Sequence, residues 1–360
     1  MDCYFLVITA IDVFVLGIMC ILTRHSETLN VQQRRWFITA FAFIIAISVL
    51  EIITIVVDRA PAPYRWINIL SNYLGFGLTP AVPIALASAL DSRRSNKYAA
   101  VIEIVYLLFL ALTFPFKLIF YVNRGNEYMR GDFFWIYLAV YLSGILYLIA
   151  MTLRVAAKYQ NKSKGLVYPI AVFLALGTMV QVVFPQIHVT WLCVTLLSIL
   201  YFIYCNEMWQ QLDGLTGLLN QNSYLNKTAS LSQKGTLIVF DVDDFKQIND
   251  NYGHLTGDQC LKEIAACIKK AYSRDGFCYR IGGDEFCVLL SADADQERCY
   301  HKLVNELNIR RKTLSILPDL SVGSAQFTGG EDVLKIKDTA DNRMYQFKKE
   351  RKNREIKIEK

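Results

Sequence analysis

Long apolar runs in the first half of this chain constrain its fold more than any other feature. Seven runs are long enough, or nearly so, to cross a bilayer as helices, since one span needs about 20 apolar residues. They cover residues 4–23, 36–57, 66–90, 98–120, 133–153, 167–184 and 189–205. From Glu207 onward the charges are mixed and the apolar runs are short, as in a globular domain. We therefore predict an α-helical membrane bundle of about seven spans followed by an α/β domain.

The domain boundaries follow from the same pattern. We predict a seven-span transmembrane sensor domain over 1–205, a helical linker over 206–213 and a globular domain over 214–360. No Gly or Pro occurs between the last run and Gly214, so we expect the last helix to continue as a stiff link. Met1 is followed by Asp2 rather than a basic segment, which argues against a cleaved signal peptide.

Basic residues are concentrated in alternate loops. The loops after the first, third and fifth runs carry Arg24, Arg34, Arg35, Arg93, Arg94, Lys97, Arg154, Lys158, Lys162 and Lys164. The other loops carry only Arg59, Arg65, Arg124 and Arg130. The positive-inside rule then predicts a multi-pass protein in the lipid bilayer, with its N-terminus outside and its globular domain in the cytosol.

Cysteine usage and the basic C-terminus agree with a cytosolic globular half. The nine cysteines include no CxxC pair, so we expect reduced, mostly buried thiols. The end of the chain, KKERKNREIKIEK, is typical of a solvated helix end near an anionic membrane. We expect no nucleic-acid partner, although such a tail is the one feature that would favour it.

Polar residues inside the predicted spans mark a candidate ligand site. Asp12, Glu51 and Glu103 are costly to place in a membrane and often belong to ligand or ion sites, although Glu103 lies near a span end and can reach water. The third run is interrupted by Gly75, Gly77, Pro80 and Pro83, which indicates a kink or a bound ligand. The sequence does not identify this ligand.

Two acidic clusters point to metal-dependent chemistry in the globular half. The strand TLIVFDVD carries Asp241 and Asp243 on one face, with Val242 on the other. The segment RIGGDEFCVLL reads as a hairpin that would bring Asp284 and Glu285 beside Asp241. Carboxylates converging on one sheet edge are typical of a Mg²⁺ site for polyphosphate chemistry.

Several motifs in order now support a family resemblance. The segments DGLTGLLNQ, FDVDDFKQINDNYGHLTGD, RIGGDEF, LSVGSA and ADNRMYQFKK occur over roughly the last 150 residues. This half resembles the GGDEF diguanylate cyclase family. The resemblance implies a central, mainly antiparallel sheet flanked by helices, similar to adenylyl cyclase and polymerase palm domains. It implies condensation of two GTP molecules into cyclic di-GMP by a homodimer, in a bacterial inner membrane.

The resemblance also implies residue roles. Asp241, the main-chain carbonyl of Val242, Asp284 and Glu285 would hold Mg²⁺, or Mn²⁺ in its place. Asp284 would accept the proton of the attacking 3′-hydroxyl, and Lys246 would offset charge on the phosphates. The residues implied to bind substrate are Asn249, His254, Asp258, Gly282, Gly283, Lys348 and Lys352.

Structural alternatives exist for four of these positions. Gly282 and Gly283 could serve a tight turn that needs positive φ angles. Asp258 could cap a helix beginning DQCLKEI, or accept hydrogen bonds from guanine N1–H and the exocyclic amine, which would favour GTP over ATP. His254 could be an ordinary loop histidine.

The chain departs from the family pattern at three places. Ser273 and Gly276 stand where many members carry the Arg and Asp of an inhibitory RxxD motif, which predicts no product inhibition there. Gln221 stands where an Arg is usual. Arg351 and Lys352 stand where Gly-Arg is common, and Lys352 keeps the charge without the donor fork of Arg.

Three functions remain open on the sequence alone. The leading one is a membrane-anchored diguanylate cyclase whose output is set by a signal at the membrane domain. The alternatives are a silent GGDEF-like module that binds nucleotide, and a transporter or channel regulated by its cytosolic domain.

Overall fold

The structure consists of two compact units, Met1–Gln210 and Gln211–Lys360, each with its own hydrophobic core. It is a computed structural model that describes residues 3–90, 96–160, 190–229 and 231–358, together with 165, 167–169, 172–173 and 176–177. The division between the units falls inside the predicted linker, 206–213.

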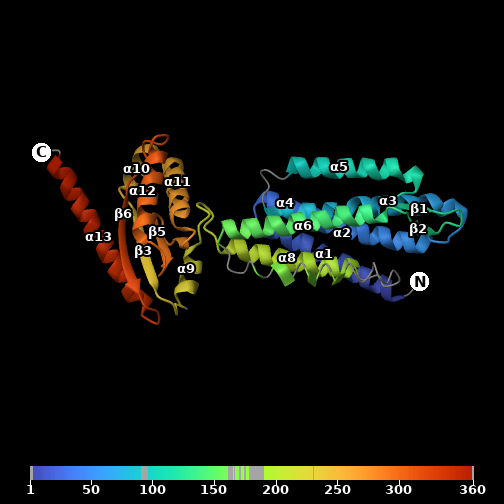
Figure 1. Cartoon of the computed structure of the whole chain (residues 1–360), viewed down its shortest axis with the longest axis horizontal. Helices are drawn as coiled ribbons and strands as arrows, with labels where there is room; N and C mark the ends of the chain where they lie inside the picture. The colour runs from blue at the N-terminus through green and yellow to red at the C-terminus, as the bar shows by residue number, and fades with distance from the viewer. Residues whose placement is uncertain are drawn as a thin grey trace. The chain divides into compact units, whose positions relative to one another are not determined.

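The first unit is a bundle of apolar helices (Figure 1). Its helices are α1 (Cys3–His25), α2 (Val31–Val57), α3 (Arg65–Leu78), α4 (Ala81–Leu90), α5 (Asn96–Thr113), α6 (Phe134–Lys158) and α8 (Thr190–Gln210). Five segments are long and apolar enough to cross a membrane, with α3 and α4 forming one of them, and Val101–Phe116 is a shorter apolar helix. The predicted run 167–184 lies largely outside the described residues, so the count of seven spans stays a prediction.

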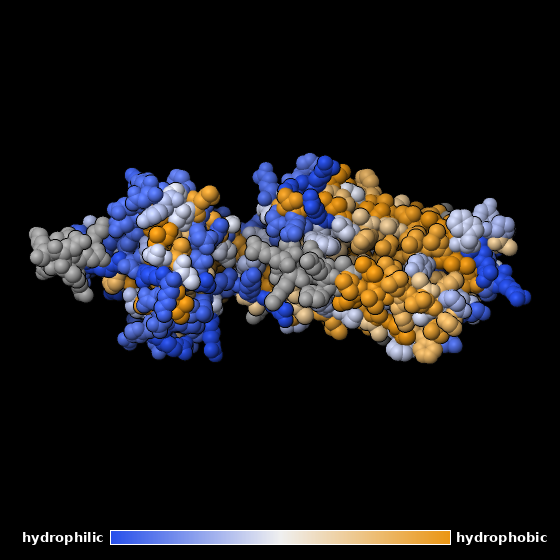
Figure 2. Space-filling view, turned by 90° about the horizontal axis from the view of Figure 1, so that it is seen from above, coloured by the Kyte–Doolittle hydropathy of each residue, from blue (hydrophilic) through white to orange (hydrophobic). Residues whose placement is uncertain are grey.

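The outer surface of this unit is strongly apolar. On α1, Val7, Phe14 and Ile21 are 57%, 69% and 62% exposed, and α5 exposes a similar set of branched residues. Figure 2 shows the resulting broad hydrophobic surface. Soluble monomers rarely expose apolar patches of such extent, so this surface fits the acyl chains of a membrane.

The fourth apolar run differs from the prediction. It was expected to be helical over 98–120, but α5 ends at Thr113, a 3₁₀ turn (Phe114–Phe116) follows, and a hairpin begins with β1 (Phe120–Val122) and β2 (Tyr128–Arg130). Pro115 accounts for the helix end, since proline lacks the amide hydrogen and restricts the residue before it. The third run is interrupted at Thr79–Pro80, between α3 and α4, at the residues that indicated a kink.

The second unit is built on a four-stranded antiparallel sheet, which confirms the predicted sheet type. Its strands are β3 (Gly235–Val242), β4 (Gly276–Arg280), β5 (Glu285–Ser291) and β6 (Leu320–Phe327), in the order β4-β5-β3-β6. Every pair of neighbouring strands is antiparallel.

Helices cover both faces of this sheet (Figure 1). One core joins α11 (His254–Tyr272) and α12 (Gln296–Arg311) to Ile238, Phe240 and Val242 of β3. The other joins α9 (Gln221–Thr228) and α13 (Val333–Ile358) to Leu237 and Val239. The alternation of strand side chains therefore puts Asp241 on the α13 face and Val242 on the opposite face, as the sequence pattern predicts.

Close contact between α13 and the sheet depends on one glycine. A Cβ atom at Gly323 of β6 would lie 2.1 Å from the Ala340 carbonyl oxygen and 2.4 Å from the Met344 nitrogen. No side chain fits there, so Gly323 lets α13 lie directly on β6 and brings the C-terminal half of that helix to the end of β3.

Candidate active site

The C-terminal end of β3 brings the predicted carboxylates together. Asp241 is the direct cross-strand partner of Glu285, and the Val242 amide donates a hydrogen bond to the Asp284 carbonyl at 3.2 Å. Residues separated by more than 40 positions thus share one sheet end, because β3 and β5 pair antiparallel along their whole length. The acidic hairpin inferred from RIGGDEF is present and lies in the predicted sheet.

Two cations of α13 bind the carboxylates of β3. Lys348 forms an ion pair with Asp241 and lies 3.7 Å from the Asp243 carboxylate. Arg351 pairs with Asp243 at 2.9 Å and with Asp319 at 2.8 Å. Because Lys348 and Arg351 are three positions apart, they lie on one helix face and act as a pair. The sequence reading assigned Lys348 to the site but gave no such role to Arg351.

Burial and charge shift the protonation of these groups. Partial burial alone would lower the pKa of Lys348, but the hydrogen bond to Asp241 and the nearby carboxylates raise it above its ordinary value. Burial raises the pKa of Asp243, and the Ser321 hydroxyl, donating at 2.7 Å, together with Arg351 and Lys348 offsets only part of that effect. Lys348 is therefore a cation at neutral pH, positioned beside Asp241.

Arg280 fixes the turn that carries Asp284. Its guanidinium donates to the Gly283 carbonyl at 2.7 Å and to the Asp213 carboxylate at 3.1 Å. Asp213 also accepts from the Thr216 amide at 2.8 Å. Partial burial would raise the pKa of Asp213, but the Thr216 and Arg280 hydrogen bonds and the Arg280 charge hold it below its usual range. Both residues lie within motifs singled out from the sequence, but their partnership was not predicted.

The two glycines of this turn do not need glycine's backbone freedom. The positive-φ glycines of the described residues are Gly217, Gly253, Gly329 and Gly330, so the turn explanation for Gly282 and Gly283 was wrong. A Cβ at Gly282 would lie 3.0 Å from a carboxylate oxygen of Glu285, whereas a Cβ at Gly283 meets nothing within 4 Å. The open space above Gly283 is consistent with close approach of a ligand.

The structural alternatives for two residues of α11, a loop position for His254 and a helix cap for Asp258, were also wrong. This helix begins at His254 rather than near Asp258, so His254 is its first residue and not a loop residue, and Asp258 lies in its second turn and does not cap it. Gly253, with φ of +82°, makes the junction between α10 (Phe245–Tyr252) and α11. The helices start and stop here because only glycine readily adopts that φ angle.

The remaining predicted residues lie around the same junction. Lys246 and His254 are exposed, and Asn249 and Asp258 are partly buried. Within the described residues, none of these four side chains is hydrogen-bonded to or ion-paired with Asp241, Asp284 or Glu285. Asn249 packs on Gly257, where an added Cβ would lie 2.0 Å from the Asn249 amide oxygen. Lys352 belongs to α13, and its side chain lies outside the described residues.

The oxygen donors at the sheet end are not gathered into a preformed metal cluster. Within the described part of the chain, no three His, Cys, Asp or Glu side chains are grouped so as to hold a metal ion. The Lys348 ion pair accounts for this at Asp241, since its ammonium group takes the place that a cation would occupy.

Comparison with known proteins identifies the second unit. Residues 210–354 match the family described as "Diguanylate cyclase, GGDEF domain". These residues form a GGDEF domain. Its sheet end, with Asp241 on one strand and Gly282–Glu285 on the next, is where the motif that names the family lies.

Related proteins match over the GGDEF domain. A probable diguanylate cyclase of Escherichia coli, DgcI, is 36% identical over 140 residues, covering 38% of this chain and 31% of the relative. The diguanylate cyclase DgcS of Shewanella oneidensis is 31% identical over 155 residues, covering 41% of this chain and 52% of the relative. This chain thus spans about a third to a half of the length of these two relatives.

Solved structures also match part of the chain. The GGDEF domain of DgcB from Caulobacter crescentus, solved in complex with c-di-GMP, is 27% identical with a TM-score of 0.33, and the match covers 39% of this chain and 90% of that structure.

Proposed function

We propose that this protein is a membrane-anchored diguanylate cyclase, a nucleotidyltransferase that condenses two GTP molecules into cyclic di-GMP and two pyrophosphates. The observation that carries the proposal is the meeting of Asp241, Asp284 and Glu285 at one sheet end of a GGDEF domain, with Lys348 beside them. The relatives named diguanylate cyclases support the same activity.

The donor chemistry at the sheet end fits Mg²⁺, or Mn²⁺ in its place. Asp241, the Val242 carbonyl, Asp284 and Glu285 offer only oxygen atoms, and Mg²⁺ needs one or two carboxylates when substrate phosphates complete its shell. These residues would hold the ion once Lys348 leaves Asp241 for a phosphate. When bound, the ion would neutralise charge on the reacting phosphates.

The chain's own residues would bind and orient GTP. Asp284 would accept the proton of the 3′-hydroxyl, and Lys246, exposed near the start of α10, would offset charge that develops on the α-phosphate. Asp258 would accept hydrogen bonds from guanine N1–H and the exocyclic amine, Asn249 would contact the same guanine edge through its amide, and His254 would contact the nucleotide. Gly282 and Gly283 would leave room for it, and Lys348 and Lys352 would bind its terminal phosphates.

Ring closure requires two chains. Each 3′-oxygen would form a bond to the α-phosphorus of the other GTP while the bond to pyrophosphate breaks, so two GTP yield one ring, two pyrophosphates and two protons. One domain presents one GTP, so a homodimer is needed and proximity controls the rate.

We propose that the membrane domain, 1–205, sets that proximity through the linker, 206–213, in a bacterial inner membrane with the N-terminus outside. The linker was predicted to be helical throughout, but its helix ends at Gln210. Support comes from α8, which is continuous to Gln210 and buries Met208 in the first core. A Gly-Ser-Gly insertion between Gln210 and Gln211 would spare that core and the Leu212–Leu219 bridge of the second unit. We expect the insertion to change cyclase output, and unchanged output would reject the coupling.

The deciding test uses the full-length protein in detergent or nanodiscs with GTP and Mg²⁺. Mass spectrometry should find cyclic di-GMP and pyrophosphate, and Asp284→Ala should lower the rate by about 10²- to 10⁴-fold. Asp293→Ala is the matched control, since Asp293 is an exposed turn residue of the same domain. Bound GTP without product in wild type, even after enforced dimerisation, would favour the silent nucleotide-binding module.

A further inference from the structure

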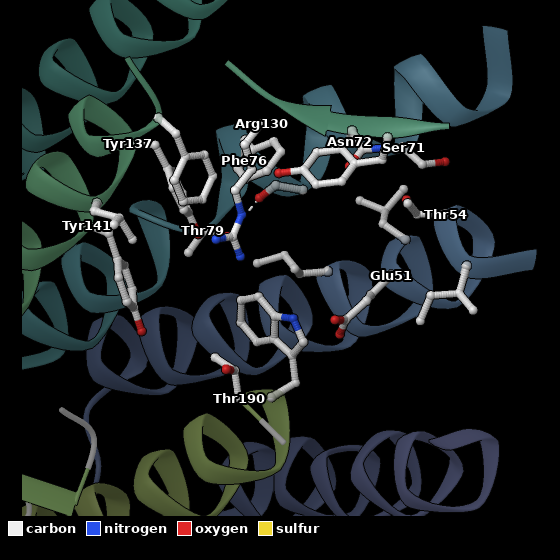
Figure 3. Close-up of a pocket in the computed structure, with 18 residues that line it drawn as sticks. Glu51, Thr54, Ser71, Asn72, Phe76, Thr79, Arg130, Tyr137, Tyr141 and Thr190 are labelled. Carbon is white, nitrogen blue, oxygen red and sulfur yellow. Dashed lines mark hydrogen bonds between the residues drawn. The ribbon is translucent and has the colours of Figure 1, made fainter. Parts of the chain in front are cut away.

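A cavity of about 320 Å³ lies inside the first unit, at the end that carries the hairpin. It is walled by α2, α3, α6, β2 and the start of α8, and its walls are mostly aromatic and aliphatic (Figure 3). Pockets of this size and composition, with a few polar groups, are typical of sites for small molecules. The family match does not reach it, since that match covers residues 210–354.

The aromatic wall is packed as a unit. Phe76 of α3 makes an edge contact with Tyr137 at 4.8 Å between ring centroids, and stacks on Tyr128 at 6.1 Å. Tyr137 is stacked with Tyr141 at 6.5 Å along α6. Such rings hold one another in place, so the wall is formed before any ligand binds.

The cavity contains one cation among its described lining residues, Arg130 of β2. Figure 3 shows its guanidinium projecting among Phe76, Tyr137 and Glu51. It lies 4.8 Å from the centre of the Phe134 ring and makes no ion pair with a carboxylate of the described residues. An arginine held over an aromatic ring, with its donors directed into a cavity, is suited to bind an anion.

The position of Arg130 is fixed by the hairpin's polar anchor. Asn126, 1% exposed, donates to the Val57 carbonyl at 2.7 Å, and the Tyr128 amide donates to the Asp58 carboxylate at 2.9 Å. Asn68, fully buried on α3, donates to the Asn126 side chain at 3.1 Å. These bonds tie β2 to the ends of α2 and α3, so the strand that carries Arg130 is fixed, and the exposed Arg130 side chain is positioned over the Phe134 ring.

The chemistry of Arg130 then selects the anion. A single guanidinium matches one carboxylate through two parallel hydrogen bonds. We propose that this cavity binds a small carboxylic acid with an aromatic or branched apolar body, its carboxylate on Arg130 and its body against Phe76 and Tyr137. An α-amino acid and a simple carboxylic acid share this chemistry.

The same cavity touches the helix that leads out of the unit. Thr190 and Trp191 line it, and the helix they begin, α8, runs without interruption to Gln210. A ligand that moves Trp191 therefore moves the first residues of a rod of 21 residues whose last residue precedes the GGDEF domain. This coupling rests on the proposed cyclase function; the binding itself does not.

Four probes with one apolar body test the site on the full-length wild type in nanodiscs. They are 3-phenylpropionate, L-phenylalanine, the neutral 3-phenylpropanamide and the cation phenethylamine, and binding is followed by tryptophan fluorescence. We expect one or both carboxylates to bind at least about tenfold more tightly than the amide. Tighter binding of phenylalanine points to an amino acid, and tighter binding of phenylpropionate to a simple acid.

Variants locate the site. Arg130→Gln should remove the preference for carboxylate over amide and Arg130→Lys should reduce it, whereas Arg124→Gln, the same change at an exposed position of the hairpin, should retain it. Trp191→Phe should remove the fluorescence response without removing binding measured by equilibrium dialysis.

Three results would overturn the proposal: equal binding of amide and acids, tightest binding of phenethylamine, or no binding of any probe up to about 10 mM. These comparisons use wild type, so they hold even if an Arg130 variant misfolds. Asp284→Ala should bind the acid as wild type does, which separates failure of this site from failure of the cyclase proposal.

Discussion

Arg280 and Asp213 form an ion pair, 3.1 Å between guanidinium nitrogen and carboxylate oxygen, that ties the first residues of the GGDEF domain to the turn that carries Asp284. The same guanidinium holds the Gly283 carbonyl at 2.7 Å. Both side chains are mostly buried, at 14% and 23% exposure. The Arg280 side chain therefore links the segment that follows α8 to the turn that carries Asp284.

Asp213→Asn should weaken both functions of this pair. It leaves Arg280 without its charge partner in a partly buried site, and we expect the unfolding free energy of the domain to fall by about 1–3 kcal/mol. We also expect slower product formation at saturating GTP, because the turn loses its anchor. Thermal unfolding and steady-state kinetics check this, with exposed Asp293→Asn as control. A stable variant with wild-type rate would show that the pair is dispensable.

The same pair predicts a pH dependence of stability. The pKa of Asp213 is lower in the folded protein than in the unfolded chain, where an Asp titrates near 3.9, so the unfolded state binds the proton more tightly. The stabilisation is therefore complete above about pH 5 and is lost as the pH falls through the folded pKa. Unfolding midpoints between about pH 6 and pH 3 should decline more in wild type than in Asp213→Asn. Parallel declines would contradict the assignment.

Gly283→Ala tests whether Gly283 is needed to leave room for the substrate or to give the turn its backbone conformation. The added methyl group meets no protein atom within 4 Å and the φ angle is not positive, so stability should be unchanged or rise by about 0.4–1 kcal/mol. If GTP lies on this turn, the KM for GTP should rise and the rate should fall by about tenfold or more. Loss of stability without loss of activity is the opposite outcome and would support a purely structural glycine.

Gly257→Ala should act through Asn249. The new Cβ would lie 2.0 Å from the Asn249 amide oxygen, so that side chain must turn away from its present position. We expect GTP affinity to fall about as much as in Asn249→Ala. The double variant should lose little more, because both changes remove the same contact between Asn249 and GTP. Isothermal titration with GTP measures all three proteins; fully additive losses would show that Asn249 is not the route.

Lys348→Gln removes the cation beside Asp241. We expect GTP to bind more weakly and product formation to fall by about tenfold or more, since a charge-assisted contact to phosphate is lost. Lys349→Gln changes the same charge at the next position of α13, where the ammonium lies over the Tyr345 ring at 4.7 Å, and should keep its activity. Equal effects of the two substitutions would point to net charge rather than to this contact.

The sequence predicted most where a local pattern decides the structure. The strand LSVGSAQF is β6 from Leu320 to Phe327, and the apolar run ending in Asp241 is β3, because alternation and strand length are local signals. The start of α11 was placed at Asp258 rather than His254, because Gly253 reads as a loop residue until its φ angle is known.

Features made by distant residues could not be predicted in this way. The Arg280–Asp213 pair joins positions 67 apart, and Arg351 meets Asp319 only because α13 lies on β6. The hairpin of β1 and β2 has strands of three residues each, too short for a periodic signal. The cavity needs five elements to approach one another, although Glu51 and Gly75, two of its lining residues, stood out in the sequence.

The pairing of Lys348 and Arg351 with Asp241 and Asp243 also sets the electric field that an approaching nucleotide meets. Two positive charges offset those of Asp241 and Asp243 at the end of β3, so an approaching triphosphate meets a less negative surface than four bare carboxylates would present. Long-range repulsion is then small, and the association rate of GTP should depend only weakly on ionic strength. If the proposed function is correct, Asp241 would become available to a metal ion only after the phosphates had drawn Lys348 away, so nucleotide capture would precede activation.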